Sequence, residues 1–325
     1  MFELHIDAVI PLDKEERLKN KKRKPSQSED NNEDNSIMDT YEKDTHNNVI
    51  SKISMFRKIL EPLGDMVDDV ELRLSSSGIN VQVMDSMRVA MANIFIPSTL
   101  FDNYRCDRNM ILGIKIKEFL KILKINDNTS NSLHMHCIDE PTEITICFNS
   151  TTHSLTYTLK LFQFDIENYN FPAQKFEIEV QMDGSEFLKA PKYIGNYAEF
   201  LQIEVNKDKV EFKQKGDIIQ ANLELKSQST GNDKVKIKVN NNVIDMNNEQ
   251  GDGETENNDN NEMADYNNIN IIKEIPIKYV GYFVKAVQQF DTLNICMGRP
   301  NPVYFELTMK DDGYFRYFVA PKVED

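Results

Sequence analysis

The chain has 325 residues and a hydrophobic content of 40%, so its length and composition predict about two domains, each with a real core. Its formal net charge of −15 at pH 7 argues, taken alone, against a nucleic-acid binder, although a net charge does not show where the charges lie. The four cysteines form no CxxC pair, which argues against a disulfide framework and a zinc site and fits a reducing compartment.

The N-terminal region begins with an alternating stretch, Phe2 to Ile10, which predicts a strand that Pro11 ends. It lacks the basic region and apolar core of a signal peptide, and no apolar run approaches the roughly 18 residues of a membrane span, so we expect a soluble intracellular protein. Residues 13–48 are polar and predict a disordered insert. Its basic run, Lys21 to Pro25, is either a nuclear localisation signal or a solvated charge run.

The first half then alternates helices and strands. A helix is expected from Ser51 or Ser54 to Val67, and Pro62 predicts a kink or a split into two turns. A hairpin turning at residues 75–78 and a second helix, Lys115 to Lys124, follow. The expected strands are Val70 to Leu74, Ile79 to Val83, Val89 to Ile96, and segments near 133–138, 143–149 and 155–162.

The segment 161–176 connects two similar halves. It carries five aromatic residues and one proline, yet its polar residues break both helical and strand periodicity. Such an apolar but irregular linker either lies on the surface and offers side chains to a partner, or is a buried crossover between domains.

The second half repeats the order of the first, about 130 positions further on. It predicts a helix from about Ser185 to Tyr197, in which Pro191 should cause a kink or an early stop, and a helix from Ile277 to Gln289. Residues 228–268 form a second polar insert with one expected strand, Val235 to Val239. The other expected strands are Lys175 to Met182, Phe200 to Val205, Val210 to Gln214, Ile218 to Leu225, 292–297, 302–309 and 314–320. The sequence thus predicts two duplicated α+β units.

Each predicted helix carries at least two cations on its polar side, inside an acidic protein. An exposed lysine usually serves solubility, but four such helices in one duplicated architecture favour a common basic surface. Lysines are point charges and lack the forked donor groups that recognise bases, so they suit contacts with phosphates that do not depend on the DNA sequence. These cations are Arg57, Lys58, Lys117, Lys121, Lys124, Lys189, Lys192, Lys278 and Lys285.

Three separated motifs stand out in the sequence: Leu74 to Ser86, Phe101 to Asn109 and the terminal Ala320 to Asp325. Together they resemble the proliferating cell nuclear antigen family of eukaryotic DNA sliding clamps, and the resemblance covers most of the chain outside the two inserts. It implies an α+β chain with two similar clamp domains, whose helices line the hole of a homotrimeric ring and whose sheets lie outside. The implied division is a domain at 1–160, a connector at 161–176 and a domain at 177–325.

The resemblance also implies the functional residues. Gly64 stands where the family often has a further lysine, Arg88 replaces an expected histidine, and Tyr169-Asn-Phe171 replaces a smaller run, so partner preference should differ. The DNA-facing set would be Arg57, Lys58, Lys121, Lys124, Lys192 and Lys285; the subunit contact Tyr157, Ile219 and Leu223; and the ubiquitin acceptor Lys207. The pocket for partner peptides would be Met84, Arg88, Val89, Tyr169, Phe171, Pro172, Gln174, Pro302, Phe318, Ala320, Pro321 and Lys322.

The implied function is a nuclear ring around double-stranded DNA that makes a replicative polymerase processive and serves replication, repair and translesion synthesis. Its expected partners are a delta-type DNA polymerase, the clamp loader, a flap endonuclease, a DNA ligase and other proteins with the same short binding peptide. No membrane partner, cofactor or metal is expected.

Three other interpretations of the function are considered. A subunit of a heterotrimeric checkpoint-type clamp would share the fold. An enzyme is disfavoured because the chain has no P-loop, GxGxxG or HExxH motif. His134 and His136 could hold a metal with a third ligand, but a surface pair is the simpler interpretation. A sequence-specific regulator would need base-reading side chains in a groove, and none is evident.

Overall fold

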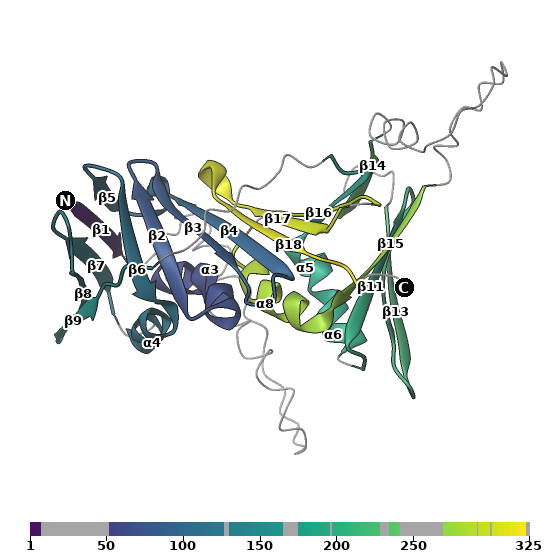
Figure 1. Cartoon of the computed structure of the whole chain (residues 1–325), viewed down its shortest axis with the longest axis horizontal. Helices are drawn as coiled ribbons and strands as arrows, with labels where there is room; N and C mark the ends of the chain where they lie inside the picture. The colour runs from purple at the N-terminus through teal and green to yellow at the C-terminus, as the bar shows by residue number, and fades with distance from the viewer. Residues whose placement is uncertain are drawn as a thin grey trace, which may run out of the picture.

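The computed structural model describes residues 1–7, 52–126, 130–164, 175–195, 197–227, 234–240, 269–290, 292–299 and 301–322. The first predicted insert, most of the second and the middle of the connector lie outside these residues. The described chain builds three antiparallel sheets. The helices α4, α3, α8 and α6 follow one another along one long side of the molecule (Figure 1).

A five-stranded sheet belongs wholly to the first half. Its strand order is β5-β1-β7-β8-β9, and all neighbours are antiparallel. Alternate residues of β1 and β7, such as Leu4 and Met135, are buried against the helices, as the period of two predicts. The strands are β1 (Phe2–Asp7), β5 (Asn103–Cys106), β7 (Ser132–Cys137), β8 (Glu143–Asn149) and β9 (Ser154–Lys160).

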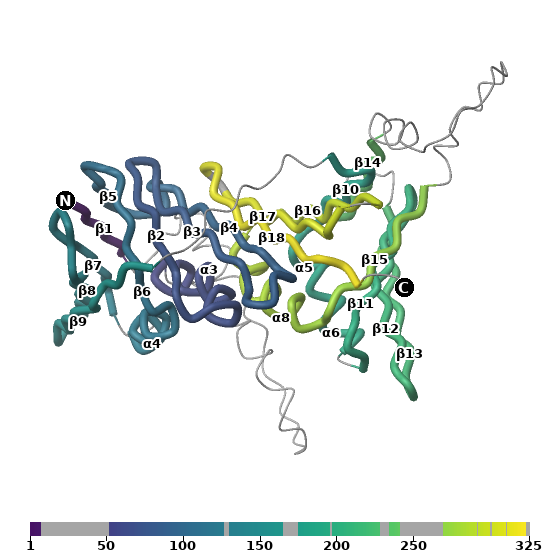
Figure 2. Tube along the Cα trace, in the orientation of Figure 1, coloured from purple at the N-terminus to yellow at the C-terminus, as the bar shows by residue number. Residues whose placement is uncertain are grey.

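A nine-stranded sheet joins the two halves of the chain. Its order is β14-β10-β16-β17-β18-β4-β3-β2-β6, so the halves meet where β18 pairs with β4. Figure 2 shows this junction, with the yellow C-terminal strand beside the blue strand of the first half. The strands are β14 (Val235–Val239), β10 (Ile178–Asp183), β16 (Thr292–Met297), β17 (Val303–Thr308), β18 (Tyr314–Val319), β4 (Ala90–Pro97), β3 (Gly78–Met84), β2 (Asp69–Ser75) and β6 (Met110–Lys115).

A four-stranded sheet, β13-β12-β11-β15, completes the second half. Its strands are β13 (Gln220–Lys226), β12 (Lys209–Lys215), β11 (Phe200–Asn206) and β15 (Asn270–Pro276). The order β13-β12-β11-β15 matches β4-β3-β2-β6, and β14-β10-β16-β17-β18 matches β5-β1-β7-β8-β9. The duplication predicted from the sequence is therefore present strand by strand.

The helices pack one apolar face on the sheets. Phe56, Phe119 and Phe283 are buried on α3 (Lys52–Met66), α4 (Ile116–Asn126) and α8 (Ile277–Val287) respectively. These burials follow the predicted helical periodicity. The helix α3 contains Pro62 but remains one element, so its predicted split into two turns is wrong.

The helix predicted from Ser185 to Tyr197 is also corrected. Two short helices replace it, α5 (Gly184–Phe187) and α6 (Lys189–Ile194). The helix α6 ends earlier than predicted, but the break between α5 and α6 falls at Leu188, and α6 continues past Pro191 to Ile194. Pro191 lies in the first turn of α6, where its missing backbone N–H is tolerated. The segment after Ile194 turns at Gly195, whose φ of 72° suits a residue without a side chain.

Candidate nucleic-acid interface, partner pocket and subunit edges

The exposed sides of α3, α4 and α8 surround one shallow hollow. Its volume is about 320 Å³, and four of the six predicted DNA-facing cations line it: Arg57, Lys121, Lys124 and Lys285. Lys117, one turn before Lys121 on α4, lies there too. Cations from three helices thus converge on one surface, although they are far apart in the sequence. Lys58 and Lys192 are not part of this hollow; the Lys192 ammonium lies 5.9 Å from the ring centre of Tyr193.

Carboxylates that were not predicted from the sequence lie among these cations. Glu61 accepts a hydrogen bond from Arg57 at 2.6 Å, and Asp65 accepts one from Lys285 of α8 at 2.6 Å. Asp68, just after α3, pairs with Lys117 at 2.5 Å, and this hydrogen bond lowers the pKa of Asp68. The i,i+4 spacing of Arg57 and Glu61 was a signal for the first pair. The other two pairs join separate elements, so the spacing of residues in the sequence could not predict them.

Gly64 has a steric role that the sequence did not reveal. A Cβ atom at this position would lie 2.8 Å from Cδ1 of Leu120 on α4. A lysine at position 64 would therefore require Leu120 to move. Because Gly64 has no side chain, α3 and α4 can approach each other closely.

The predicted partner pocket includes the turn between β3 and β4, which Asp85 holds in place. The buried carboxylate of Asp85 accepts hydrogen bonds from the backbone amides of Met87, Val89 and Ala90, at 3.3, 2.8 and 2.6 Å. It accepts a fourth from the Tyr279 hydroxyl, at 2.8 Å, across the junction of the two halves. Burial and this hydrogen bond raise the pKa of Tyr279.

This bonding fixes two predicted pocket residues. Arg88 takes a φ of 56°, a left-handed conformation that is uncommon for a residue with a side chain. Val89 accepts a hydrogen bond from the amide of Ala320, at 2.8 Å, so the C-terminal tail lies against the turn.

A row of large side chains crosses the outer face beside this turn. Register places Met84 opposite Met91, Met91 opposite Phe318, and Phe318 opposite Tyr304. The rings of Phe318 and Tyr304 are 4.5 Å apart, and Tyr304 stacks on Phe176 at 5.4 Å. The row links the C-terminal strand to the far end of the connector, and Met91 and Tyr304 are members that the sequence reading missed.

The remaining predicted pocket residues divide into two groups. Pro302 directly precedes β17, one position beyond the pair Val303 and Val319, and so lies near Ala320. The amide of Lys322 donates to the carbonyl of Glu274 at 2.7 Å, which fixes the tail beyond Pro321. Tyr169, Phe171, Pro172 and Gln174 lie outside the described residues.

The start of the connector is attached to the sheet. The amide of Phe162 donates to the carbonyl of Gly113 on β6 at 2.9 Å, and a side chain at Gly113 would collide with the Phe162 carbonyl. The Lys115 ammonium lies 5.8 and 5.6 Å from the rings of Phe162 and Phe164. This part of the connector is therefore attached to the sheet edge through a single β-bridge.

The predicted subunit contact falls on two edge strands. Tyr157 lies on β9, the outer strand of the five-stranded sheet, and Leu223 lies on β13, the outer strand of the four-stranded sheet. Ile219, 46% exposed, directly precedes β13. The partly buried Leu159 and Ala221 share the core-facing side of these strands with Tyr157 and Leu223.

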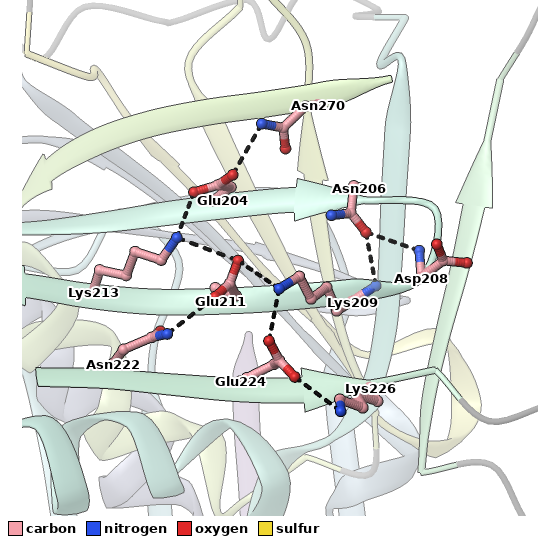
Figure 3. A network of polar contacts seen from close by, with 10 residues as sticks. All are labelled: Glu204, Asn206, Asp208, Lys209, Glu211, Lys213, Asn222, Glu224, Lys226 and Asn270. Carbon is pink, nitrogen blue, oxygen red and sulfur yellow. Dashed lines mark hydrogen bonds and ion pairs between the residues drawn. The ribbon is translucent and has the colours of Figure 1, made fainter. Parts of the chain in front are cut away.

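Lys207 is exposed at the tip of the turn between β11 and β12. The side-chain oxygen of Asn206 accepts hydrogen bonds from the amides of Asp208 and Lys209, both at 3.0 Å (Figure 3). These bonds hold the backbone on both sides of Lys207, so its side chain projects from a fixed turn.

The part of the chain that the structure describes offers no ready metal site. No group of three or more His, Cys, Asp or Glu residues within it could hold a metal ion. His134 instead bonds Glu3 at 2.9 Å. Among the same residues, no helix is both long and apolar enough to span a membrane.

Two equivalent halves joined through one continuous sheet, with basic helices along one side, define a DNA sliding clamp. The sequence matches the proliferating cell nuclear antigen N-terminal domain over residues 47–169 and the corresponding C-terminal domain over residues 170–250. The chain therefore belongs to the proliferating cell nuclear antigen family. It is 28% identical to proliferating cell nuclear antigen of Caenorhabditis elegans over 278 residues, which span 85% of this chain and 96% of the relative. Clamps of this family are non-enzymatic scaffolds, which confirms the prediction that the chain is not an enzyme.

Proposed function

We propose that three copies of the chain form a closed ring around double-stranded DNA, with α3, α4, α6 and α8 on the inside. The observation that supports this proposal is that two edge strands of the chain are free, although the strands equivalent to them in the other half are paired with each other. Among the described strands, β5 and β14 are equivalent edges of the two halves, and so are β6 and β15. The strands β9 and β13 are edges too, but their equivalents β18 and β4 pair with each other inside the chain.

Pairing β9 of one copy with β13 of the next would repeat the internal junction. The internal register places Phe315, Tyr317 and Val319 opposite Ile94, Ala92 and Ala90. Equivalent positions on the free edges give the pairs Leu155 with Leu223, Tyr157 with Ala221, and Leu159 with Ile219. Head-to-tail contacts of this kind close into a ring when the rotation allows it, and they leave no such edge exposed.

The ring would act as a processivity factor and a docking platform. Point-charge cations on its inner wall would contact phosphates without reading bases, which permits sliding. The proposed pocket, Met84, Arg88, Val89, Pro302, Phe318 and the tail with the connector, would receive short peptides with aromatic anchors. The proposed partners are a delta-type polymerase, the clamp loader, a flap endonuclease and a DNA ligase.

Several finer assignments are part of the same proposal. The division into domains at 1–160 and 177–325 with a connector between them follows the duplication. We place the protein in the nucleus, with Lys207 as an acceptor for ubiquitin and with roles in DNA repair and translesion synthesis.

The ring is tested by mass and by cross-linking. Light scattering of the purified chain should give about three times 37.7 kDa. A variant with Tyr157→Cys and Ala221→Cys should form disulfide-linked oligomers on mild oxidation, and Tyr157→Cys with Asn222→Cys, shifted by one residue, should not. A stable monomer at high concentration would contradict the homotrimer and favour a clamp with unlike subunits.

The inner wall is tested separately. Charge reversal by Lys121→Glu with Lys285→Glu should lower clamp-dependent processivity of the polymerase and leave the trimer mass unchanged, because both side chains lie away from the proposed edges. Unchanged processivity would contradict the assignment of these helices to the DNA-facing side.

A further inference from the structure

The hollow between α3, α4 and α8 is not purely basic. Five cations line it, and Glu61 and Asp65 of α3 stand among them. The Arg57–Glu61 pair lies within α3, whereas the Lys285–Asp65 pair crosses from α8 to α3. By contrast, no carboxylate of the described residues lies within ion-pair distance of Lys121 or Lys124. The wall therefore contains both paired and unpaired cations.

The Lys285–Asp65 pair contributes little to holding the fold together. The side chains of Lys285 and Asp65 are 43% and 32% exposed, and solvated ion pairs of this kind add little stability. The packing of the helices depends on their buried faces instead. Carboxylates on a surface that must approach DNA phosphates are also repelled by them, so they need another explanation.

We propose that Glu61 and Asp65 are built-in counter-ions of the DNA-facing wall. Each carboxylate holds its cation in an ordered pair, and a DNA phosphate must break that pair before it can bind the cation. The wall would then keep enough positive charge at Lys121 and Lys124 to retain DNA at its centre, while weak contacts elsewhere let it slide. This inference deepens the proposed function and rests on it.

The inference predicts tighter DNA binding when the carboxylates are neutralised. The variant Glu61→Gln with Asp65→Asn keeps the side-chain shapes and removes two negative charges. The matched control is Glu71→Gln with Glu306→Gln, which removes two charges from pairs with Arg73 and Arg316 on sheet strands. Both variants change the net charge equally, so only the position of the change differs.

The measurement is fluorescence anisotropy of a short labelled duplex, titrated with each variant at about 50 to 200 mM NaCl. Each released cation should steepen the plot of log affinity against log salt by about 0.9, so two should enlarge the loss of affinity between about 50 and 200 mM NaCl roughly tenfold and tighten binding at the low-salt end. The control variant should bind like the unaltered protein. Equal tightening in both variants would reveal a net-charge effect and overturn the inference, and so would no tightening in the wall variant.

The single variant Asp65→Asn keeps the test decisive if the double variant folds poorly, because it should show about half of the change in slope. The variant Lys121→Glu with Lys285→Glu distinguishes the two levels of proposal. If it leaves DNA binding intact, the inner wall itself is misassigned. If it weakens binding while neutralised Glu61 and Asp65 change nothing, only the role of the counter-ions is wrong.

Discussion

At the scale of single residues, the contact between Asp85 and Tyr279 connects the two halves of the chain. Their side chains meet across 194 positions of sequence, and both are buried. Sequence motifs pointed to Met84, Arg88 and Val89 through the family resemblance. These motifs could not identify Tyr279, because Tyr279 is only one of several residues on the buried face of its helix. Its importance lies in one hydroxyl group whose acceptor belongs to a distant turn.

The variant Tyr279→Phe tests this contact. Removal of the hydroxyl leaves Asp85 with its backbone donors alone, so the free energy of unfolding should fall by about 1–3 kcal/mol. Urea unfolding measures the change. Tyr282→Phe is the matched control. The ring of Tyr282 packs edge-on against that of Tyr279, with 5.8 Å between the ring centres, and Tyr282 is only partly buried. An equal loss in both variants would show that removing a tyrosine hydroxyl from this helix, rather than breaking the hydrogen bond to Asp85, is responsible.

At the scale of secondary-structure elements, strong periodicity predicted most of the fold. The alternation of β16 and the apolar stripe of α8 were predicted at or near their observed bounds. The strands β5, β6 and β15 were missed. Strand β6 runs directly into α4 without a turn signal and contains Gly113, and β15 follows the second polar insert. The pairing of β18 with β4 could not be predicted either, because both strands look like ordinary amphipathic strands until the two halves are placed side by side.

The outer face of the four-stranded sheet carries a ladder of charges (Figure 3). Lys213 bonds Glu204 at 2.6 Å and Glu211 at 3.2 Å, and Lys209 bonds Glu224 at 2.6 Å. The hydrogen bonds from Lys213 and from Lys209 hold the pKa values of Glu204 and Glu224 below their ordinary 4.5. Burial works in the opposite direction at Glu211, but its bonds from Asn222, Lys209 and Lys213 outweigh it and lower the pKa there too.

A lowered carboxylate pKa sets the sign of the pH dependence. The folded state binds these protons less readily than the unfolded state, so the ladder stabilises the sheet above the ordinary pKa of 4.5. That stability should be lost as the pH falls through the folded-state values. Urea unfolding between about pH 6 and about pH 3 should show the decline, and Glu211→Gln should reduce its slope. An unchanged slope in the Glu211→Gln variant would assign the acid sensitivity to groups outside the ladder.

At the scale of the whole molecule, the duplication leaves one junction incomplete. The chain makes the β18–β4 contact once internally, and its equivalents β9 and β13 are left at opposite ends of the molecule (Figure 1). In the proposed ring, β13 of a second copy would pair with β9 in the register of the internal contact. The same geometry gathers the cations on one side, which explains how a chain with a formal net charge of −15 can act on DNA.

The edge at β13 gives the sharpest test of assembly. Ile219 is 46% exposed in the single chain, and Ile272 on β15 is 45% exposed. Both lie at edges of the same sheet, but only Ile219 belongs to the edge proposed to pair with another copy. Ile219→Lys should therefore bury an unpaired charge in the ring and shift the light-scattering mass toward the monomer, whereas Ile272→Lys should leave the trimer intact. Dissociation by Ile272→Lys alone would move the subunit contact from β13 to β15 and overturn the derived register.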